Sequence, residues 1–214
     1  MHSRHPLRPA PPVDRVCVTS RFNRVLALVV WALAALIVAG LAVATPDTWL
    51  VSVIPAAWVS VLAWVALWQP NICVDNDGVE LRNVFQTVAV PWPALIHVDT
   101  KYALTLYTPG HSYSAWAAPA PGHMTSVRAA RHDAHSAGGT HPHSDGGMRP
   151  GDLLGTDSGQ AAHVVRRRWA ELQGRNAIEV GVAERTPVVV SVHWYTLTAV
   201  VLLSAGSLAV ALLT

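Results

Sequence analysis

The residues with the clearest chemical potential are histidines and aspartates gathered in the middle of the chain. Five histidines fall within 21 residues, beside two aspartates: His123, His132, His135, His141, His143, Asp133 and Asp145. Imidazole and carboxylate groups bind Zn²⁺, Ni²⁺ or Cu²⁺. Their spacing, however, follows no established ligand pattern, and the neighbouring glycines provide no rigid frame. The pattern favours a low-complexity loop, with weak adventitious metal binding as the alternative, and we assign no metal or other cofactor.

A second group that could act on a ligand is the basic run Arg166, Arg167 and Arg168. Each Lys or Arg near an anionic lipid surface contributes about 1 kcal/mol of binding. We therefore expect this run to contact anionic lipid headgroups, with a solvated helix face as the alternative. Aromatic residues are not interleaved with basic ones, so we expect no nucleic-acid partner.

The two cysteines, Cys17 and Cys73, are separated widely in the sequence and neither belongs to a Cys-x-x-Cys pair. A metal or redox role is therefore not indicated. Both are expected on the cytoplasmic side of a membrane, as argued below, where thiols remain reduced. The sequence thus predicts two free thiols.

Signatures of catalysis are missing from the sequence. It contains no Gly-x-Ser-x-Gly element, no phosphate-binding glycine loop and no paired-carboxylate pattern. We therefore expect that the protein is not an enzyme.

Three stretches without Asp, Glu, Lys or Arg dominate the organisation of the chain. They cover 25–46, 48–74 and 186–214, with lengths of 22, 27 and 29 residues. A helix of about 20 apolar residues spans a bilayer. The composition agrees, because 13% charged residues is well below the roughly 25% of a soluble domain. The sequence predicts three transmembrane helices, the first two forming a hairpin around Pro46 and Asp47.

The distribution of basic residues predicts how these spans are oriented. All 15 Lys and Arg residues lie before the first span or between the second and third, and none lies in the 45–48 link. Basic residues near spans remain in the cytoplasm. We expect a multi-pass protein of the inner cell membrane, with the N-terminus and central domain cytoplasmic and the C-terminus external.

Between the second and third spans, apolar residues alternate with polar ones over residues 71–117, which is typical of antiparallel strands. Asp75-Asn76-Asp77-Gly78 and Thr108-Pro109-Gly110-His111 are hairpin turn signals. Further on, Ala161, Val165, Trp169 and Leu172 recur at helical spacing, after an N-cap expected at Asp157. The predicted organisation is a flexible tail (1–23), two transmembrane helices (24–69), a cytoplasmic domain (70–185) with a disordered insertion (118–157), and a third transmembrane helix (186–214).

Three segments carry a resemblance to a known family. They are Val74-Asp75-Asn76-Asp77-Gly78-Val79-Glu80-Leu81-Arg82-Asn83, Val90-Pro91-Trp92-Pro93, and the hairpin Leu104 to Trp116. Over about residues 20–117 the chain resembles the PH-like membrane proteins of high-GC Gram-positive bacteria, of the low molecular weight protein antigen 6 PH domain type. The resemblance implies a strongly bent antiparallel sheet or sandwich closed by a helix, in an α+β membrane protein. It implies little about activity.

Within that domain we expect four structural anchors. Gly78 would supply a positive φ in the first turn, while Trp92 and Trp116 would fill the core, and Trp169 would lie on the apolar stripe of the helix. The expected function is a membrane-anchored, non-enzymatic interaction or scaffold module with an unknown protein partner. The alternative is an accessory or regulatory subunit of a larger membrane transporter or enzyme complex.

Overall fold

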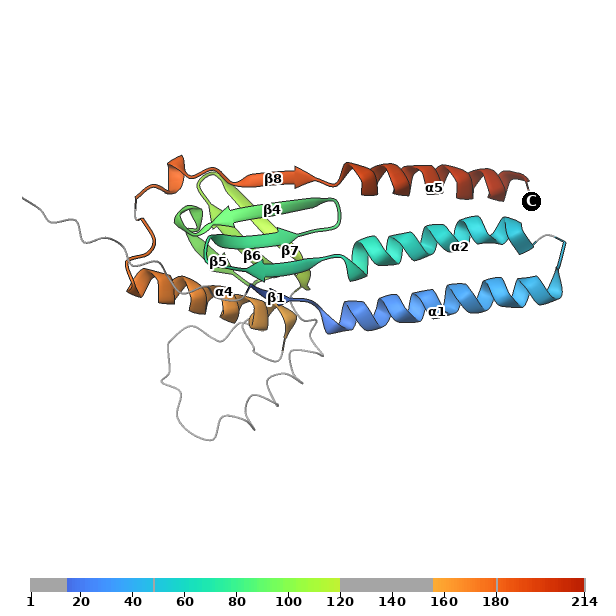
Figure 1. Cartoon of the computed structure of the whole chain (residues 1–214), viewed down its shortest axis with the longest axis horizontal. Helices are drawn as coiled ribbons and strands as arrows, with labels where there is room; N and C mark the ends of the chain where they lie inside the picture. Colours follow the sequence, from blue (N-terminus) through green and yellow to red (C-terminus); the bar gives the residue numbers. More distant parts are fainter. Residues whose placement is uncertain (1–14, 48, 120–155, 180, 214) are drawn as a thin grey trace, which may run out of the picture. The chain divides into compact units, whose positions relative to one another are not determined.

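The computed structural model describes residues 15–47, 49–119, 156–179 and 181–213 (Figure 1). The long helices are α1 (Arg21–Ala44), α2 (Trp49–Ala63), α4 (Asp157–Gly174) and α5 (Trp194–Leu213). Short helical turns are η1 (Trp64–Trp68), η2 (Trp92–Ala94) and η4 (Ala183–Arg185). The strands are β1 (Val16–Val18), β2 (Asn71–Val74), β3 (Gly78–Arg82), β4 (Gln86–Pro91), β5 (His97–Asp99), β6 (Ala103–Thr108), β7 (His111–Pro119) and β8 (Val189–Val192).

The strands form two sheets. The larger has the order β1-β2-β3-β4-β8 and the smaller the order β5-β6-β7. The pairs β1–β2, β5–β6 and β6–β7 are antiparallel. Both hairpin turns expected from the sequence lie where predicted, since β2 ends at Val74 before β3 begins at Gly78, and β6 ends at Thr108 before β7 begins at His111. The second turn needs its glycine, because Gly110 has a φ of 77°.

The chain divides into two compact units. The first, the β unit, comprises Met1–Thr19, Asn71–Leu81 and Val88–Val189. Its core is filled by apolar residues that alternate along the strands, with Ile72, Leu81, Leu104 and Leu106 fully buried. Fully burying a side chain of this size stabilises a fold by about 1.5–3 kcal/mol. The period-two pattern of the sequence therefore corresponds to one buried face of each sheet.

Helix α4 closes this core. Its N-cap is Thr156, whose side chain accepts a hydrogen bond from the Gly159 amide at 3.0 Å, so the expected N-cap Asp157 is instead the first helical residue. Ala161, Val165 and Leu172 are buried at the spacing expected for one helix face, and Trp169 is half-buried against them. The expected α+β class, with antiparallel sheets and a closing helix, is confirmed.

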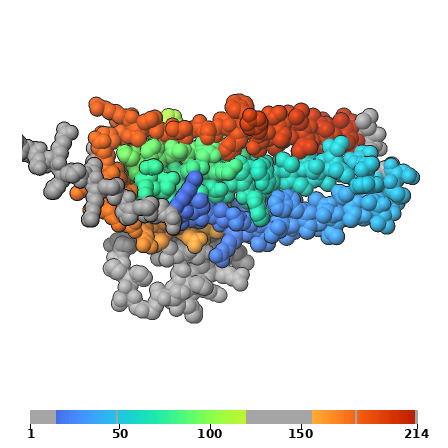
Figure 2. All heavy atoms as spheres, viewed as in Figure 1, coloured from blue at the N-terminus to red at the C-terminus, as the bar shows by residue number. Residues whose placement is uncertain are grey.

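The second unit, the helical unit, comprises Ser20–Pro70, Arg82–Thr87 and Val190–Thr214. Within it α2 packs against both α1 and α5 (Figures 1 and 2). Tryptophans make polar contacts along these packed faces, since the Trp31 indole donates to the Ser60 carbonyl at 3.0 Å and the Trp58 indole donates to Ser204 Oγ at 2.9 Å. Bonds of this kind satisfy indole N–H groups that lipid cannot.

Three helical segments are long and apolar enough to cross a membrane: Arg21–Ala44, Trp49–Trp68 and Trp194–Leu212. This agrees with the three spans predicted from the sequence, in length and composition. The third span differs in its start, because the expected range 186–214 includes strand β8. The reason lies in the run Val188 to Val192, whose β-branched residues favour a strand over a helix.

The N-terminal boundary also needs correction. The flexible tail expected over 1–23 includes strand β1 and the first residues of α1, whose N-cap Ser20 accepts a hydrogen bond from the Asn23 amide at 3.2 Å. At the other boundary, the insertion expected over 118–157 is too wide at both ends, because Ala118 and Pro119 belong to β7 and Asp157 belongs to α4. Residues 120–155, on which the rest of that prediction rests, lie outside the described residues.

Candidate functional site

Helix α4 does not present its three arginines as one surface. Arg168 is 7% exposed, and its guanidinium donates to Glu171 Oε2 at 3.0 Å and to Asn76 Oδ1. Among the described residues, Arg168 Nε has no hydrogen-bond partner. The expectation that Arg168 contacts lipid headgroups is therefore wrong, because helical periodicity turns it toward the sheet and it ties α4 to the β2–β3 turn.

The other two arginines remain on the surface. Arg166 donates to the Val98 carbonyl at 3.0 Å, and Arg167 Nε donates to Glu171 Oε1 at 3.0 Å. Hydrogen bonds from Arg168, and then from Arg167, lower the pKa of Glu171. Part of the positive charge of this helix is thus balanced within α4. Contact of Arg166 and Arg167 with anionic headgroups stays a prediction.

The β2–β3 turn is held in place by hydrogen bonds to its own residues and to Trp92. Asp75 Oδ1 accepts the amides of Asp77 and Gly78 at 3.0 and 2.9 Å. Trp92 then fastens the turn, because its indole donates to the Asp75 carbonyl at 3.1 Å and its amide to the Asp77 carbonyl at 3.2 Å. Trp92 is 2% exposed and belongs to the core. The polar groups of this turn are consequently used in holding the fold.

Gly78 is required for a different reason from the one expected. Among the described glycines, a positive φ occurs at Gly110 and Gly181, and Gly78 does not share it. Instead, a Cβ atom at Gly78 would lie 2.3 Å from the Val90 carbonyl oxygen and 2.9 Å from Pro91 Cα. The close approach of β3 to the end of β4 therefore leaves no room for a side chain.

Two exposed aromatic residues of the β unit, Tyr107 and Trp116, lie on one side of the three-stranded sheet. We define the exposed sheet face by five residues on alternate positions of β5 to β7: His97, Tyr107, Ser112, Ser114 and Trp116. Tyr107 lies opposite both His97 and Ser112 in the strand register, and the His97 and Tyr107 rings are 5.9 Å apart. The opposite side of the same strands carries core residues such as Leu104 and Leu106.

Trp116 belongs to this exposed face and not to the core. It is 55% exposed, whereas its neighbours Ala115 and Ala117 are 2% and 3% exposed. The expectation that Trp116 anchors the core is therefore wrong. The sequence did contain a signal for this exposure. Trp116 alternates with Ser112 and Ser114, and residues two apart in a strand share a face. The prediction of a buried indole considered only the hydrophobicity of tryptophan.

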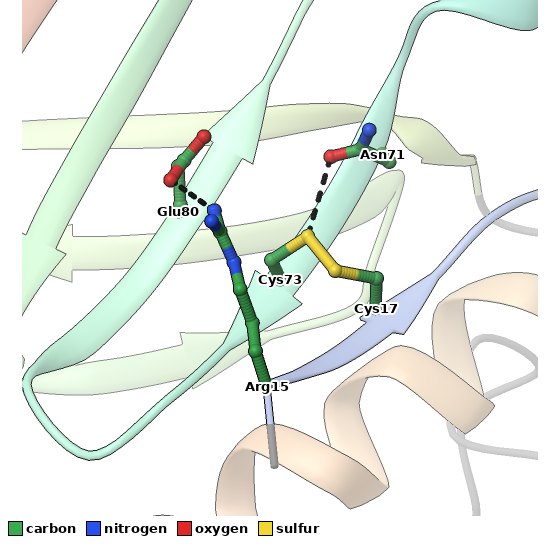
Figure 3. The surroundings of a disulfide bond; sticks show 5 residues. All are labelled: Arg15, Cys17, Asn71, Cys73 and Glu80. Carbon is green, nitrogen blue, oxygen red and sulfur yellow. Dashed lines mark hydrogen bonds and ion pairs between the residues drawn. A yellow bond between two sulfur atoms is a disulfide. The ribbon is translucent and has the colours of Figure 1, made fainter.

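The N-terminal strand is attached to the β unit by a disulfide bond. Cys17 on β1 lies directly opposite Cys73 on β2, and the two are bonded (Figure 3). The Asn71 side-chain oxygen lies 3.6 Å from Cys73 Sγ, and Arg15 forms an ion pair with Glu80 on β3. In this structure the two thiols are not free as expected, because pairing of β1 with β2 joins residues 56 positions apart.

In the helical unit, polar side chains gather around His193, just before α5. The Thr87 hydroxyl lies 2.8 Å from His193 Nε2, and the Gln69 side-chain amide lies 3.3 Å from His193 Nδ1. With its amide oxygen turned toward the ring, Gln69 also accepts from Arg82 at 3.2 Å. Both ring nitrogens are thus within reach of partners, which favours a structural role for this histidine.

Metal binding finds no support in the described part of the chain. In residues 15–47, 49–119, 156–179 and 181–213 no group of three or more His, Cys, Asp or Glu side chains is placed to hold an ion. The histidine cluster from His123 to His143 lies outside these residues.

Comparison with known proteins bears on the strands and turns just described. Residues 69–143 match the model of a family described as bacterial PH domain. The match covers about a third of the chain and includes the strands from β2 to β7. No curated protein and no solved structure matches the chain. The β unit is therefore PH-like, and PH domains are in general non-catalytic interaction modules.

Proposed function

We propose that this protein is a membrane-anchored, non-enzymatic module whose PH-like domain binds a protein partner through the exposed sheet face. The observation that carries the proposal is that Trp116, which is 55% exposed, and Tyr107, which is 40% exposed, lie on the same face of the three-stranded sheet. Tyrosine and tryptophan are enriched at protein interfaces and at their energetic hot spots.

The composition of the face favours a protein over a lipid headgroup. Its aromatic residues stand beside hydroxyl groups, and Thr105 and Ser114 are joined by a hydrogen bond of 2.9 Å. None of the five residues that define the face is a Lys or Arg, the groups that anionic phosphate would require. Neutral polar groups around aromatic anchors are typical of adaptable protein interfaces.

The strand connections support part of the expected topology. The segments before α1, after η1 and before α5 continue into β1, β2 and β8, which belong to one sheet. If the three helices span a bilayer, those three ends lie on the same side and the C-terminal end of α5 lies on the other. The segregation of Lys and Arg favours a cytoplasmic position for the sheet side. We propose this arrangement in the inner cell membrane, with Arg166 and Arg167 near anionic headgroups.

Purification of the tagged full-length protein from its own membranes in mild detergent tests the proposal. A double variant, Tyr107→Ala with Trp116→Ala, should lose its co-purifying partner by roughly tenfold or more, since hot-spot truncation costs about 2 kcal/mol or more. Tyr102→Ala is the matched control, because Tyr102 is 79% exposed in the β5–β6 connection, off the face. Equal recovery of the partner by all three proteins would refute binding through this face. A stoichiometric complex with a transporter or membrane enzyme would identify the accessory-subunit alternative.

A further inference from the structure

We propose that the Cys17–Cys73 disulfide is a reversible redox latch that fixes strand β1 at the edge of the five-stranded sheet. The inference rests on the cytoplasmic placement in the proposed function. The cytoplasm keeps thiols reduced, and disulfides found there are usually transient or redox-sensing. In that compartment, a disulfide between directly opposed cysteines is therefore expected to form and break reversibly and not to be a permanent structural bond.

Apart from its short ladder with β2, strand β1 has few contacts that hold it besides this bond. It is three residues long and lies at the edge of its sheet. Val16 is 44% exposed, and Val18 is only partly buried against the core. An ion pair next to the strand joins Arg15 to Glu80, whose side chains are 50% and 34% exposed. Exposed ion pairs contribute little, and a short strand that buries little apolar area opens easily.

The two sulfur atoms differ in a way that suits reversible exchange. Cys17 lies on an exposed strand position, whereas Cys73 is 4% exposed. Thiol–disulfide exchange requires access to the attacked sulfur. We place the attack at Cys17, the more exposed of the two residues, and the leaving sulfur is then that of Cys73. The Asn71 side-chain oxygen, 3.6 Å from Cys73 Sγ, is placed to accept the S–H of the reduced thiol (Figure 3).

The reaction balances with a pair of cellular thiols as the two-electron reductant. A thiolate attacks Cys17 Sγ, a mixed disulfide forms, the Cys17–Cys73 bond breaks, and the electron pair and a proton go to Cys73 Sγ. A second thiolate then attacks the sulfur of the bound reductant. This releases the oxidised reductant and leaves Cys17, which also takes up a proton. Oxidation to the disulfide is the reverse, with a disulfide compound as oxidant.

Opening of the latch would change which strand forms the edge of the sheet. With β1 released, the backbone groups of β2 that face β1 lose their partners over Ile72 to Val74. A free strand edge of this kind can accept an added strand from another chain. The redox state of the cysteine pair would thereby control access to β2.

Hydrogen exchange of the purified full-length protein, oxidised and reduced, tests the latch. Reduction should accelerate exchange at Val16–Val18 at least tenfold and leave the central strand residues Leu104 and Leu106 unchanged. The variant Cys17→Ser with Cys73→Ser should show the fast exchange whether or not reductant is present. Unchanged exchange at Val16–Val18 after reduction would overturn the proposal, because the bond would then not be what holds β1.

Trapping of the thiol state in living cells completes the test. Rapid alkylation should find the pair mainly reduced in unstressed cells and oxidised after treatment with a thiol oxidant, returning when the oxidant is removed. A pair that stays oxidised, or never oxidises, overturns the latch.

A single cysteine introduced at Asp47 or Glu184 in the double-serine background reports the orientation separately. External labelling at 184 would refute the cytoplasmic placement, and with it a cytoplasmic switch, while the exchange result would stand.

Discussion

Replacement of Trp92 by alanine is expected to lower the free energy of unfolding by about 3–5 kcal/mol. Trp92 is 2% exposed within the core of the β unit. The change removes the largest side chain of that core and leaves a cavity. It also frees the Asp75 carbonyl, which accepts the indole N–H at 3.1 Å. Urea or thermal unfolding of the full-length protein in detergent, followed by circular dichroism, would measure the loss.

Two further variants separate the contributions of Trp92. Trp92→Phe keeps most of the apolar volume and removes the hydrogen bond. It should therefore be more stable than Trp92→Ala but less stable than the wild type, and the lost hydrogen bond accounts for about 0.5–1.5 kcal/mol of that difference from the wild type. Trp116→Ala, at the 55% exposed position, should change stability by no more than about 1 kcal/mol. If Trp116→Ala were as damaging as Trp92→Ala, the division between core and exposed face would be wrong.

Replacement of Gly78 by alanine is expected to destabilise the β unit by roughly 3 kcal/mol, at the upper end of the range for overpacking. The added Cβ would lie 2.3 Å from the Val90 carbonyl oxygen, so backbone atoms and not a flexible side chain must move. That shift would also strain the bonds from the Asp77 and Gly78 amides to Asp75 Oδ1. The same unfolding measurement applies.

Gly174→Ala is the matched control for Gly78. Nothing lies within 4 Å of a Cβ atom built at Gly174, which is the last residue of α4. Alanine should therefore be neutral there, or stabilise the helix by up to about 1 kcal/mol. Wild-type stability of the Gly78→Ala protein would show that β3 and the end of β4 do not approach as closely as described.

The sequence predicted the elements whose signals are local. Alternation predicted the strands between residues 71 and 117, and the Asp75–Gly78 and Thr108–His111 turns predicted two hairpins. Uninterrupted apolar runs predicted the three helices that are long and apolar enough to cross a membrane. Each of these signals depends on residues a few positions apart, where period and turn chemistry determine structure. The PH-like arrangement of these elements was implied by the resemblance to PH-like membrane proteins.

What the sequence did not predict depends on contacts between distant segments. Strand β1 has three residues, too few for a pattern, and its partner β2 begins more than 50 residues later. In the sequence, Arg168 cannot be distinguished from its two arginine neighbours. Only the packing of α4 brings it into contact with Asn76. Trp116 was misplaced because a large aromatic residue favours burial on average, while its strand register favours the surface.

A photo-crosslinking amino acid at Ser112, in the full-length protein in living cells, tests most directly whether the exposed sheet face binds a protein. Ser112 lies opposite Tyr107 in the strand register and is exposed, and the control position is Tyr102. We predict a protein adduct of defined mass from position 112 and none from position 102. Adducts to lipid alone from position 112, or the same adducts from both positions, would contradict the account.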